Sequence, residues 1–189
     1  MASSPKRQAR EPLWSQPTTP MRRRMPTAVS AWLLDPASLT ARLKGLCGAG
    51  FRVRLLRQKW RRPQACEAQR LGMLRGEFAL VREVHLYCGE RVLVYARTVI
   101  PRSTLKGRTR SLARLGTRPL GEVLFADPNM QRGPLEIARI PRDIPDYRAF
   151  LGEGLAGDAA WGRRSVFRLS GRSLLVSEIF LPGMPEFPG

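Results

Sequence analysis

The chain is 189 residues long and carries 33 Lys and Arg residues against 15 Asp and Glu residues, which gives a formal net charge of +18. This length is enough for one domain with a sizeable core, plus extensions. The charge favours an anionic partner, such as a nucleic acid, a membrane surface or a small acidic substrate, without choosing among them. No apolar run reaches the ~18 residues of a membrane-spanning helix, so the sequence predicts no membrane span.

The cysteines are few and widely spaced. Cys47, Cys66 and Cys88 are odd in number, and the chain has a single histidine, His85. This set fits neither a disulfide framework nor a zinc signature. The sequence therefore predicts reduced thiols in a cytoplasmic protein, and no metal site.

The two ends of the chain differ in composition from its middle. Residues 1–27 are rich in Ser, Pro and Arg, which is typical of a disordered extension; an arginine-rich, acid-poor leader is also typical of an organelle transit peptide. We expect one domain over residues 28–182, in which the Pro-, Gly- and Asp-rich segment 141–160 is a loop insertion. The tail, residues 183–189, is expected to fray.

Asp35 and Pro36 predict a helix start, with Asp35 as the N-cap and Pro36 at the first helical position. The apolar positions of this helix, spaced i, i+4 and i+7, are Leu39, Leu43 and Leu46. Gly45 or Gly48 would end it. Beyond it, residues 51–55 alternate as a half-buried strand with a wet basic face, and residues 57–76 suggest an irregular connection or flap.

Two strands are predicted over residues 79–88 and 92–100. Gly89-Glu90 makes a hairpin turn between them, and so short a connection implies antiparallel pairing. On the first strand Arg82 shares a face with aliphatic residues, while the opposite face, expected to point outward, carries Glu83, His85 and Tyr87. His85 is thus expected at the surface or in an interface. Arg97 lies among apolar neighbours on the second strand, and we expect its guanidinium to reach water. The same alternative is open for Arg82.

Shorter elements follow. A short helix is predicted over residues 109–115, ended by Gly116, and a helical turn over residues 120–125, begun by Pro119. Proline at the start leaves the amide N–H of Leu120 free, which favours an anion there. Another short strand is predicted over residues 135–140.

The segment 161–182 predicts a β-hairpin with Ser170-Gly171 as its two-residue turn. On its return strand, alternation places Glu178 on one face with Leu174, Val176 and Phe180. A carboxylate on an apolar face must be paired, protonated or engaged with a ligand, because burying an isolated charge is costly. Glu178 is therefore a candidate functional residue. A purely structural Arg82–Glu178 ion pair is the alternative.

Tight hairpins interspersed with short helices predict an α+β fold, with an antiparallel sheet and helices on one side. A G-x-G-x-x-G sequence occurs at residues 152–157. A dinucleotide-binding motif of this kind follows a strand and opens a helix, whereas a strand follows here. The sequence therefore predicts no dinucleotide cofactor.

Five blocks of sequence are informative when taken together, in order along the chain: WLLDPASLTARL (32–43), LVREVHL (80–86), YARTVIPRSTL (95–105), RLGTRPLGEVLF (114–125) and WGRRSVFRLSGRSLLVSEIFLP (161–182). They resemble the successive blocks of the chorismate pyruvate-lyase family. The resemblance implies one domain with a six-stranded antiparallel sheet, surrounding helices and a pocket closed by flaps. It also implies conversion of chorismate to 4-hydroxybenzoate and pyruvate, the first committed step toward ubiquinone in bacteria, with no cofactor or metal.

The same resemblance implies four ligand contacts. Arg82 would bind the ring carboxylate with its bidentate fork, Leu120 would add its backbone amide, and Leu39 a further backbone contact. Glu178 would meet the opposite end of the ring and donate a proton to the departing oxygen, since burial favours a protonated carboxyl. Arg82 and Glu178 are thus the predicted catalytic residues. We expect a monomer that binds chorismate and 4-hydroxybenzoate.

Two other functions stay open at this stage. Effector domains of some bacterial transcription regulators resemble the same fold, and fold does not fix chemistry. Such a sensor normally carries a helix-turn-helix, for which residues 1–27 are too short and proline-rich. A nucleic-acid-binding protein would suit the +18 charge, but the chain has no recognisable module or aromatic platform, so no specific nucleic-acid partner is predicted.

Overall fold

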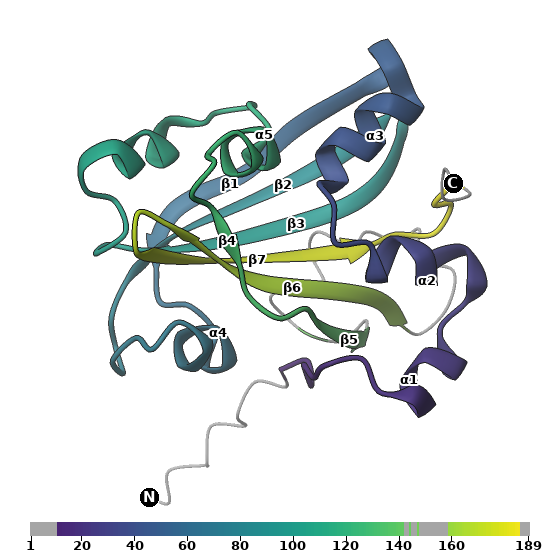
Figure 1. Cartoon of the computed structure of the whole chain (residues 1–189), viewed down its shortest axis with the longest axis horizontal. Helices are drawn as coiled ribbons and strands as arrows, with labels where there is room; N and C mark the ends of the chain where they lie inside the picture. The colour runs from purple at the N-terminus through teal and green to yellow at the C-terminus, as the bar shows by residue number, and fades with distance from the viewer. Residues whose placement is uncertain (1–10, 142–143, 145–146, 148–158, 186–189) are drawn as a thin grey trace, which may run out of the picture.

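The computed structural model describes residues 11–141, 144, 147 and 159–185. A twisted antiparallel sheet runs through it, with helices α3 and α5 lying across one face (Figure 1). The helices are α1 (Thr19–Arg24), α2 (Thr27–Leu34), α3 (Leu39–Cys47), α4 (Ala65–Arg70) and α5 (Leu120–Phe125), with 3-10 turns η1 (Gly48–Gly50) and η2 (Gly107–Arg114). The strands are β1 (Phe51–Arg61), β2 (Ala79–Cys88), β3 (Arg91–Pro101), β4 (Gln131–Arg132), β5 (Glu136–Pro141), β6 (Ala159–Leu169) and β7 (Arg172–Phe180).

The sheet has the order β1-β2-β3-β7-β6-β4, and β5 also pairs with β6. Every pairing is antiparallel. The predicted α+β fold is confirmed, but the described residues form seven strands rather than six. The additional strand arises because the chain follows one edge of β6 in two short pieces, β4, which ends at Arg132, and β5, which begins at Glu136.

The hairpin β6–β7 forms as its turn residues predict. Ser170 and Gly171 both have positive φ, 50° and 73°, which is the backbone of the two-residue turn that suits the twist of paired strands. The turn sets the register, in which Arg163 lies opposite Glu178. This register brings the side chains of Arg163 and Glu178 together.

The helix-covered face of the sheet holds two apolar clusters. Leu39 and Leu43 of α3 pack with Trp32 and Leu33 of α2 against β2 and β3. Leu120 and Leu124 of α5 pack with η2 against β6 and β7. Helix α3 begins at Leu39 and not at Pro36, because the side chain of Ser38 accepts from the amide of Ala41 as the N-cap. Asp35 instead ends α2.

The other end of α3 also differs in part from the sequence-based prediction. Gly48 follows the helix with a φ of 51°, as expected of a glycine at a helix end. Leu46, however, is 41% exposed rather than buried. The buried stripe of α3 is therefore shorter than the apolar spacing predicts.

The opposite face of the sheet is also buried, which corrects the expectation that it points outward. Glu83 accepts from Arg97 Nη1 at 2.7 Å and from Arg57 Nε at 2.5 Å. Arg97 does not reach water, since its Nε donates to Glu67 at 2.7 Å. Glu67 belongs to α4, which replaces the expected irregular connection and covers this face. His85, on the same face, is half-buried and lies beside the rings of Tyr87 on β2 and Tyr95 on β3.

Residues 11–27 are ordered against the domain, so the expectation of a disordered extension does not hold for them. The Glu11 carboxylate accepts from the amides of Ala65 and Cys66 at 2.7 and 2.8 Å, at the start of α4. Ser15 pairs with Ile137 of β5. At the other end, the indole of Trp32 donates to the Pro185 carbonyl at 2.8 Å, which holds residue 185 of the expected tail.

Cys47 and Cys88 form a disulfide with a Cα–Cα distance of 5.4 Å, which corrects the prediction of reduced thiols. The bond connects the end of α3 to the end of β2. The fold brings these ends together because η1 leads from Cys47 directly into β1, whose first residue, Phe51, lies opposite Cys88. Cys66 is the one free cysteine.

Three features fall partly or wholly beyond the described residues. Most of the expected insertion 141–160 is one, and the G-x-G-x-x-G sequence within it is another. The last is the end of the tail, residues 186–189. Within the described part of the chain, no helix is both long and apolar enough to span a membrane.

Candidate active site

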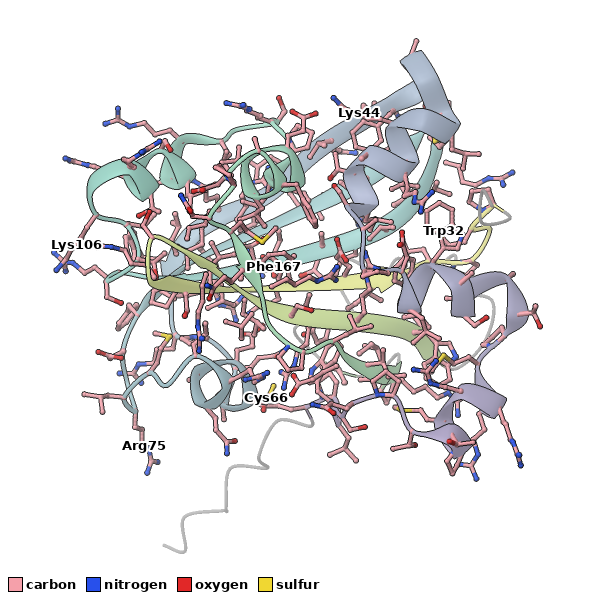
Figure 2. All side chains as sticks on the ribbon, in the orientation of Figure 1. Trp32, Lys44, Cys66, Arg75, Lys106 and Phe167 are labelled. Atoms are coloured by element: carbon pink, nitrogen blue, oxygen red, sulfur yellow. A yellow bond between two sulfur atoms is a disulfide. The ribbon has the colours of Figure 1, made fainter. Side chains whose placement is uncertain are left out.

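One cavity lies between the sheet and the helices α3 and α5, and all four predicted ligand contacts line it. These are Leu39, Arg82, Leu120 and Glu178. Its walls are mainly apolar, with Val84, Leu86, Val176 and Phe167 among them. Phe167 is labelled near the middle of the sheet in Figure 2. Apolar walls with a few convergent polar groups are typical of a small-molecule site.

Arg82 extends from β2 into this cavity and is only 2% exposed. Its Nη2 donates to the carbonyls of Gly116 and Arg118 at 2.9 and 3.1 Å. Its buried Nε has no partner, and among the described residues Arg82 makes no ion pair. Burial lowers the pKa of Arg82 to about 10. A desolvated guanidinium with a spare donor and no counter-ion favours an anionic ligand.

The two carbonyls that Arg82 binds belong to the turn directly before α5. Proline at position 119 leads into α5, whose first residue is Leu120. The amide of a first helical residue has no partner within its helix, so the Leu120 N–H is a second donor at this end of the cavity. Thus Arg82 both presents a charge and holds the turn that positions Leu120.

Helices α3 and α5 approach closely above the cavity. A Cβ atom on Gly121 would lie 2.5 Å from Thr40 Oγ1, a distance that real Cβ atoms do not tolerate. Glycine at this position therefore permits the contact between the two helices. Their approach places Leu39 and Leu120 on the same side of the cavity.

Glu178 enters the cavity from β7, with its side chain 19% exposed. Its Oε2 accepts from Arg163 Nε at 2.6 Å, and no described residue donates to its Oε1. Arg163 Nη1 also donates to the carbonyls of Trp32 and Asp35, at 2.7 Å each. The alternative of a structural Arg82–Glu178 ion pair is therefore wrong, because Arg163 pairs with Glu178 and leaves Arg82 with no carboxylate partner among the described residues.

Sequence reasoning missed Arg163 and Arg132, a second arginine that lines the cavity. Strand alternation alone does not show which residue of β6 faces Glu178, since this depends on the register of the hairpin. Counting back from the Ser170-Gly171 turn would have placed Arg163 opposite Glu178. Arg132 carries no such signal, because β4 is only two residues long.

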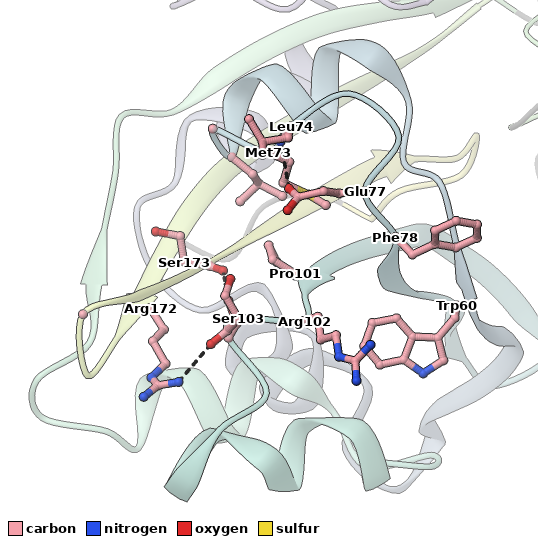
Figure 3. A pocket seen from close by; sticks show the side chains of 14 residues that line it. Trp60, Met73, Leu74, Glu77, Phe78, Pro101, Arg102, Ser103, Arg172 and Ser173 are labelled. Atoms are coloured by element: carbon pink, nitrogen blue, oxygen red, sulfur yellow. Dashed lines mark hydrogen bonds between the residues drawn. The ribbon is translucent and has the colours of Figure 1, made fainter.

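A second, wider depression lies at the end of the sheet where β1 and β3 end and β7 begins, and it is lined by Trp60, Leu74 and Phe78 among others (Figure 3). It contains none of the predicted site residues. Its arginine Arg172 already donates to the Ser103 carbonyl at 2.9 Å, shown as a dashed line. The cavity beneath α3 and α5 is the better candidate, because it alone of the two joins a desolvated cation to a carboxylate.

The site also has a defined chemical character. Among the described residues, no group of three or more His, Cys, Asp or Glu side chains is placed to hold a metal ion. The cavity instead offers two arginines that pair with no carboxylate of the described chain, one paired carboxylate and apolar walls. This combination suits a small acid with an apolar ring.

Fold and site together define a small-molecule-binding α+β domain. The C-terminal domain of the histidine utilization repressor from Pseudomonas syringae superposes with a TM-score of 0.57 at 10% identity, covering 74% of this chain and 96% of that chain. A GntR-family transcriptional regulator from Bacillus cereus superposes with a TM-score of 0.54 at 16% identity, over 74% and 97%. At such identities the similarity shows the fold alone.

Sequence comparison is more specific. The chorismate lyase family matches residues 9–186. Proteins named "Probable chorismate pyruvate-lyase" match from Methylococcus capsulatus, at 48% identity over 163 residues (85% of this chain and 98% of that protein), and from Azoarcus sp., at 48% over 165 residues (83% and 87%). The chain therefore belongs to the chorismate lyase family and is a lyase. The match includes residues 9–27, and the structure shows residues 11–27 packed against the domain.

Proposed function

We propose that this lyase converts chorismate to 4-hydroxybenzoate and pyruvate without a cofactor, as the first committed step toward ubiquinone. The observation that carries the proposal is that one apolar cavity is lined both by Arg82, which is buried and has no counter-ion among the described residues, and by Glu178. Relatives at 48% identity bear the corresponding name, which supports the same substrate.

In this proposal the ring carboxylate of chorismate binds at the Arg82 end. The guanidinium supplies a charge-assisted hydrogen bond, and the Leu120 amide supplies a further donor. Both donors are held in place before the substrate arrives, because Arg82 is bonded to the turn that leads into α5. Positioning of this kind lowers the barrier without a covalent step.

Glu178 serves the reacting end of the ring. The C3–O bond of the enolpyruvyl ether breaks and its electron pair leaves with the oxygen, C4 loses its proton, and the C4 hydroxyl becomes the phenol of the product. The departing enolpyruvate takes up a proton to become pyruvate. Because Arg163 engages Oε2, Oε1 is the oxygen placed to exchange a proton or hydrogen bond with the reacting atoms.

The test is to incubate the purified protein with chorismate in the presence of a chelator. The proposal predicts 4-hydroxybenzoate, followed by its absorbance, and an equal amount of pyruvate, measured with lactate dehydrogenase. A protein that binds chorismate without forming either product would instead be a sensor, as the regulatory proteins of this fold would suggest. That result would overturn the proposal.

A further inference from the structure

Arg132 is fixed in the wall of the cavity by two separate parts of the chain. Its Nε donates to Ser165 Oγ of β6 at 3.2 Å, and its Nη1 donates to the Pro36 carbonyl at 2.7 Å. Its guanidinium lies 5.3 Å from the centre of the Phe167 ring. A side chain held at three points is a preorganised group rather than a mobile surface arginine.

Arg132 has no carboxylate to neutralise it within the part of the chain that the structure describes. The carboxylate on this side of the cavity belongs to Glu178, which Arg163 already engages at 2.6 Å. Burial, together with the nearby charge of Arg163, lowers the pKa of Arg132. Its Nη2 donates to no described residue, so at least one N–H remains for a ligand.

The charges that line the cavity do not cancel. Three arginines, Arg82, Arg132 and Arg163, and one carboxylate, Glu178, are the charged residues among its described lining. The excess of two positive charges suits a ligand that carries two negative charges. Chorismate has two carboxylates, one on the ring and one on the enolpyruvyl group, whereas 4-hydroxybenzoate has one.

We propose that Arg132 binds the carboxylate of the enolpyruvyl group and so determines the specificity of the cavity for a dicarboxylic substrate over its monocarboxylic product. The inference rests on the proposed function, which places the ring carboxylate at Arg82. Arg132 belongs at the other end, because Ser165, to which it donates, shares a face of β6 with Arg163, the partner of Glu178. The group that leaves the ring would thus be held beside the carboxyl at the reacting end.

The experiment compares Arg132→Gln with Arg168→Gln, which removes the same charge from an exposed position on β6. The steady-state constants for chorismate and the Kd of 4-hydroxybenzoate, by calorimetry, are measured for both. Loss of a charge-assisted hydrogen bond predicts a fall in chorismate kcat/KM of about 10- to 150-fold for Arg132→Gln. The Kd of 4-hydroxybenzoate should change less than about threefold, and Arg168→Gln should match the wild type in both.

Arg132→Lys separates this role from a purely structural one. It keeps the charge but loses the planar fork, so it should recover part of the chorismate kcat/KM. Equal losses for chorismate and 4-hydroxybenzoate in Arg132→Gln, or no loss for chorismate, would overturn the inference. If the wild type binds chorismate but does not turn it over, the proposed function fails separately, and the ratio of the two Kd values still decides the role of Arg132.

Discussion

Arg163 and Glu178 lie directly opposite each other on β6 and β7, and Arg163 Nε donates to Glu178 Oε2 at 2.6 Å. The same guanidinium donates to the carbonyls of Trp32 and Asp35 at the end of α2. One side chain therefore fixes the orientation of the carboxyl and joins it to a helix that contributes no charge to the site. Oε1 of Glu178 is left to face the cavity.

Replacing Glu178 with Gln should mainly lower turnover. The amide keeps the size of the side chain but cannot exchange a proton, so kcat for chorismate should fall by about 10²–10⁴-fold. The measurement is the steady-state rate of 4-hydroxybenzoate formation. Glu90→Gln is the matched control, since the Glu90 side chain is 93% exposed. A kcat close to that of the wild type would remove Glu178 from the chemistry.

Replacing Arg82 with Ala should weaken product binding. The substitution removes the guanidinium that would pair with the carboxylate of the bound ligand. Loss of such a desolvated charge pair costs about 2–5 kcal/mol, or a 30- to 5,000-fold rise in the Kd of 4-hydroxybenzoate. Isothermal calorimetry measures this Kd directly. Arg102→Ala, which removes a charge from the wider depression, should leave it unchanged. An unaltered Kd in Arg82→Ala would show that the ring carboxylate binds elsewhere.

The pairing of Glu83 predicts that stability is lost in acid. Burial opposes the charge of Glu83, but its bonds with Arg57 and Arg97 lower its pKa below the ordinary value. A carboxyl whose pKa is lower in the folded state stabilises the fold above its unfolded pKa of about 4.3, and this contribution is lost as the pH falls through the folded pKa. Thermal unfolding should therefore show a falling Tm below about pH 4.

Glu83→Gln gives the corresponding control. It should have a lower Tm than the wild type at neutral pH, because it leaves part of the charge of Arg97 and Arg57 unpaired in the interior. The difference between the two proteins should shrink as the pH falls, since acid neutralises the wild-type carboxyl as well. A difference that stays constant from neutral to acidic pH would contradict this account of Glu83.

The disulfide between Cys47 and Cys88 should stabilise the fold. It closes a loop with a sequence separation of 41 residues, for which the loss of unfolded-state entropy corresponds to about 4 kcal/mol. Urea unfolding with and without a reductant measures the effect. Cys66→Ser, which alters the free cysteine, should keep the dependence on reductant. Equal midpoints under both conditions would show that the bond contributes nothing.

The sequence predicted well those elements that are determined by residues close together in the chain. The turn at Ser170-Gly171, the strand from Ala79 to Cys88 and the face shared by Glu178 and its apolar neighbours all follow from short-range patterns. In the structure, Arg82 and Glu178 line one cavity. The roles assigned to them in catalysis stay predictions.

Features that depend on tertiary packing were not predicted. The outward placement of Glu83 assumed that one face of β2 meets water, whereas Glu67 and the rest of α4 cover it. The disulfide requires that the end of α3 lies beside the end of β2, and the spacing of the cysteines along the chain does not predict this contact. Asp35 and Ser38 both suit an N-cap, and the choice between them depends on where α2 ends.

The central claim is that Arg82 and Glu178 address opposite ends of one aromatic acid. The most direct measurement is a crystal structure of the protein with 4-hydroxybenzoate. The account predicts the ligand beneath α3 and α5, its carboxylate within hydrogen-bond distance of Arg82 and its hydroxyl facing Glu178. A ligand seated in the depression beside Trp60, or one whose carboxylate contacts neither Arg82 nor the Leu120 amide, would contradict it.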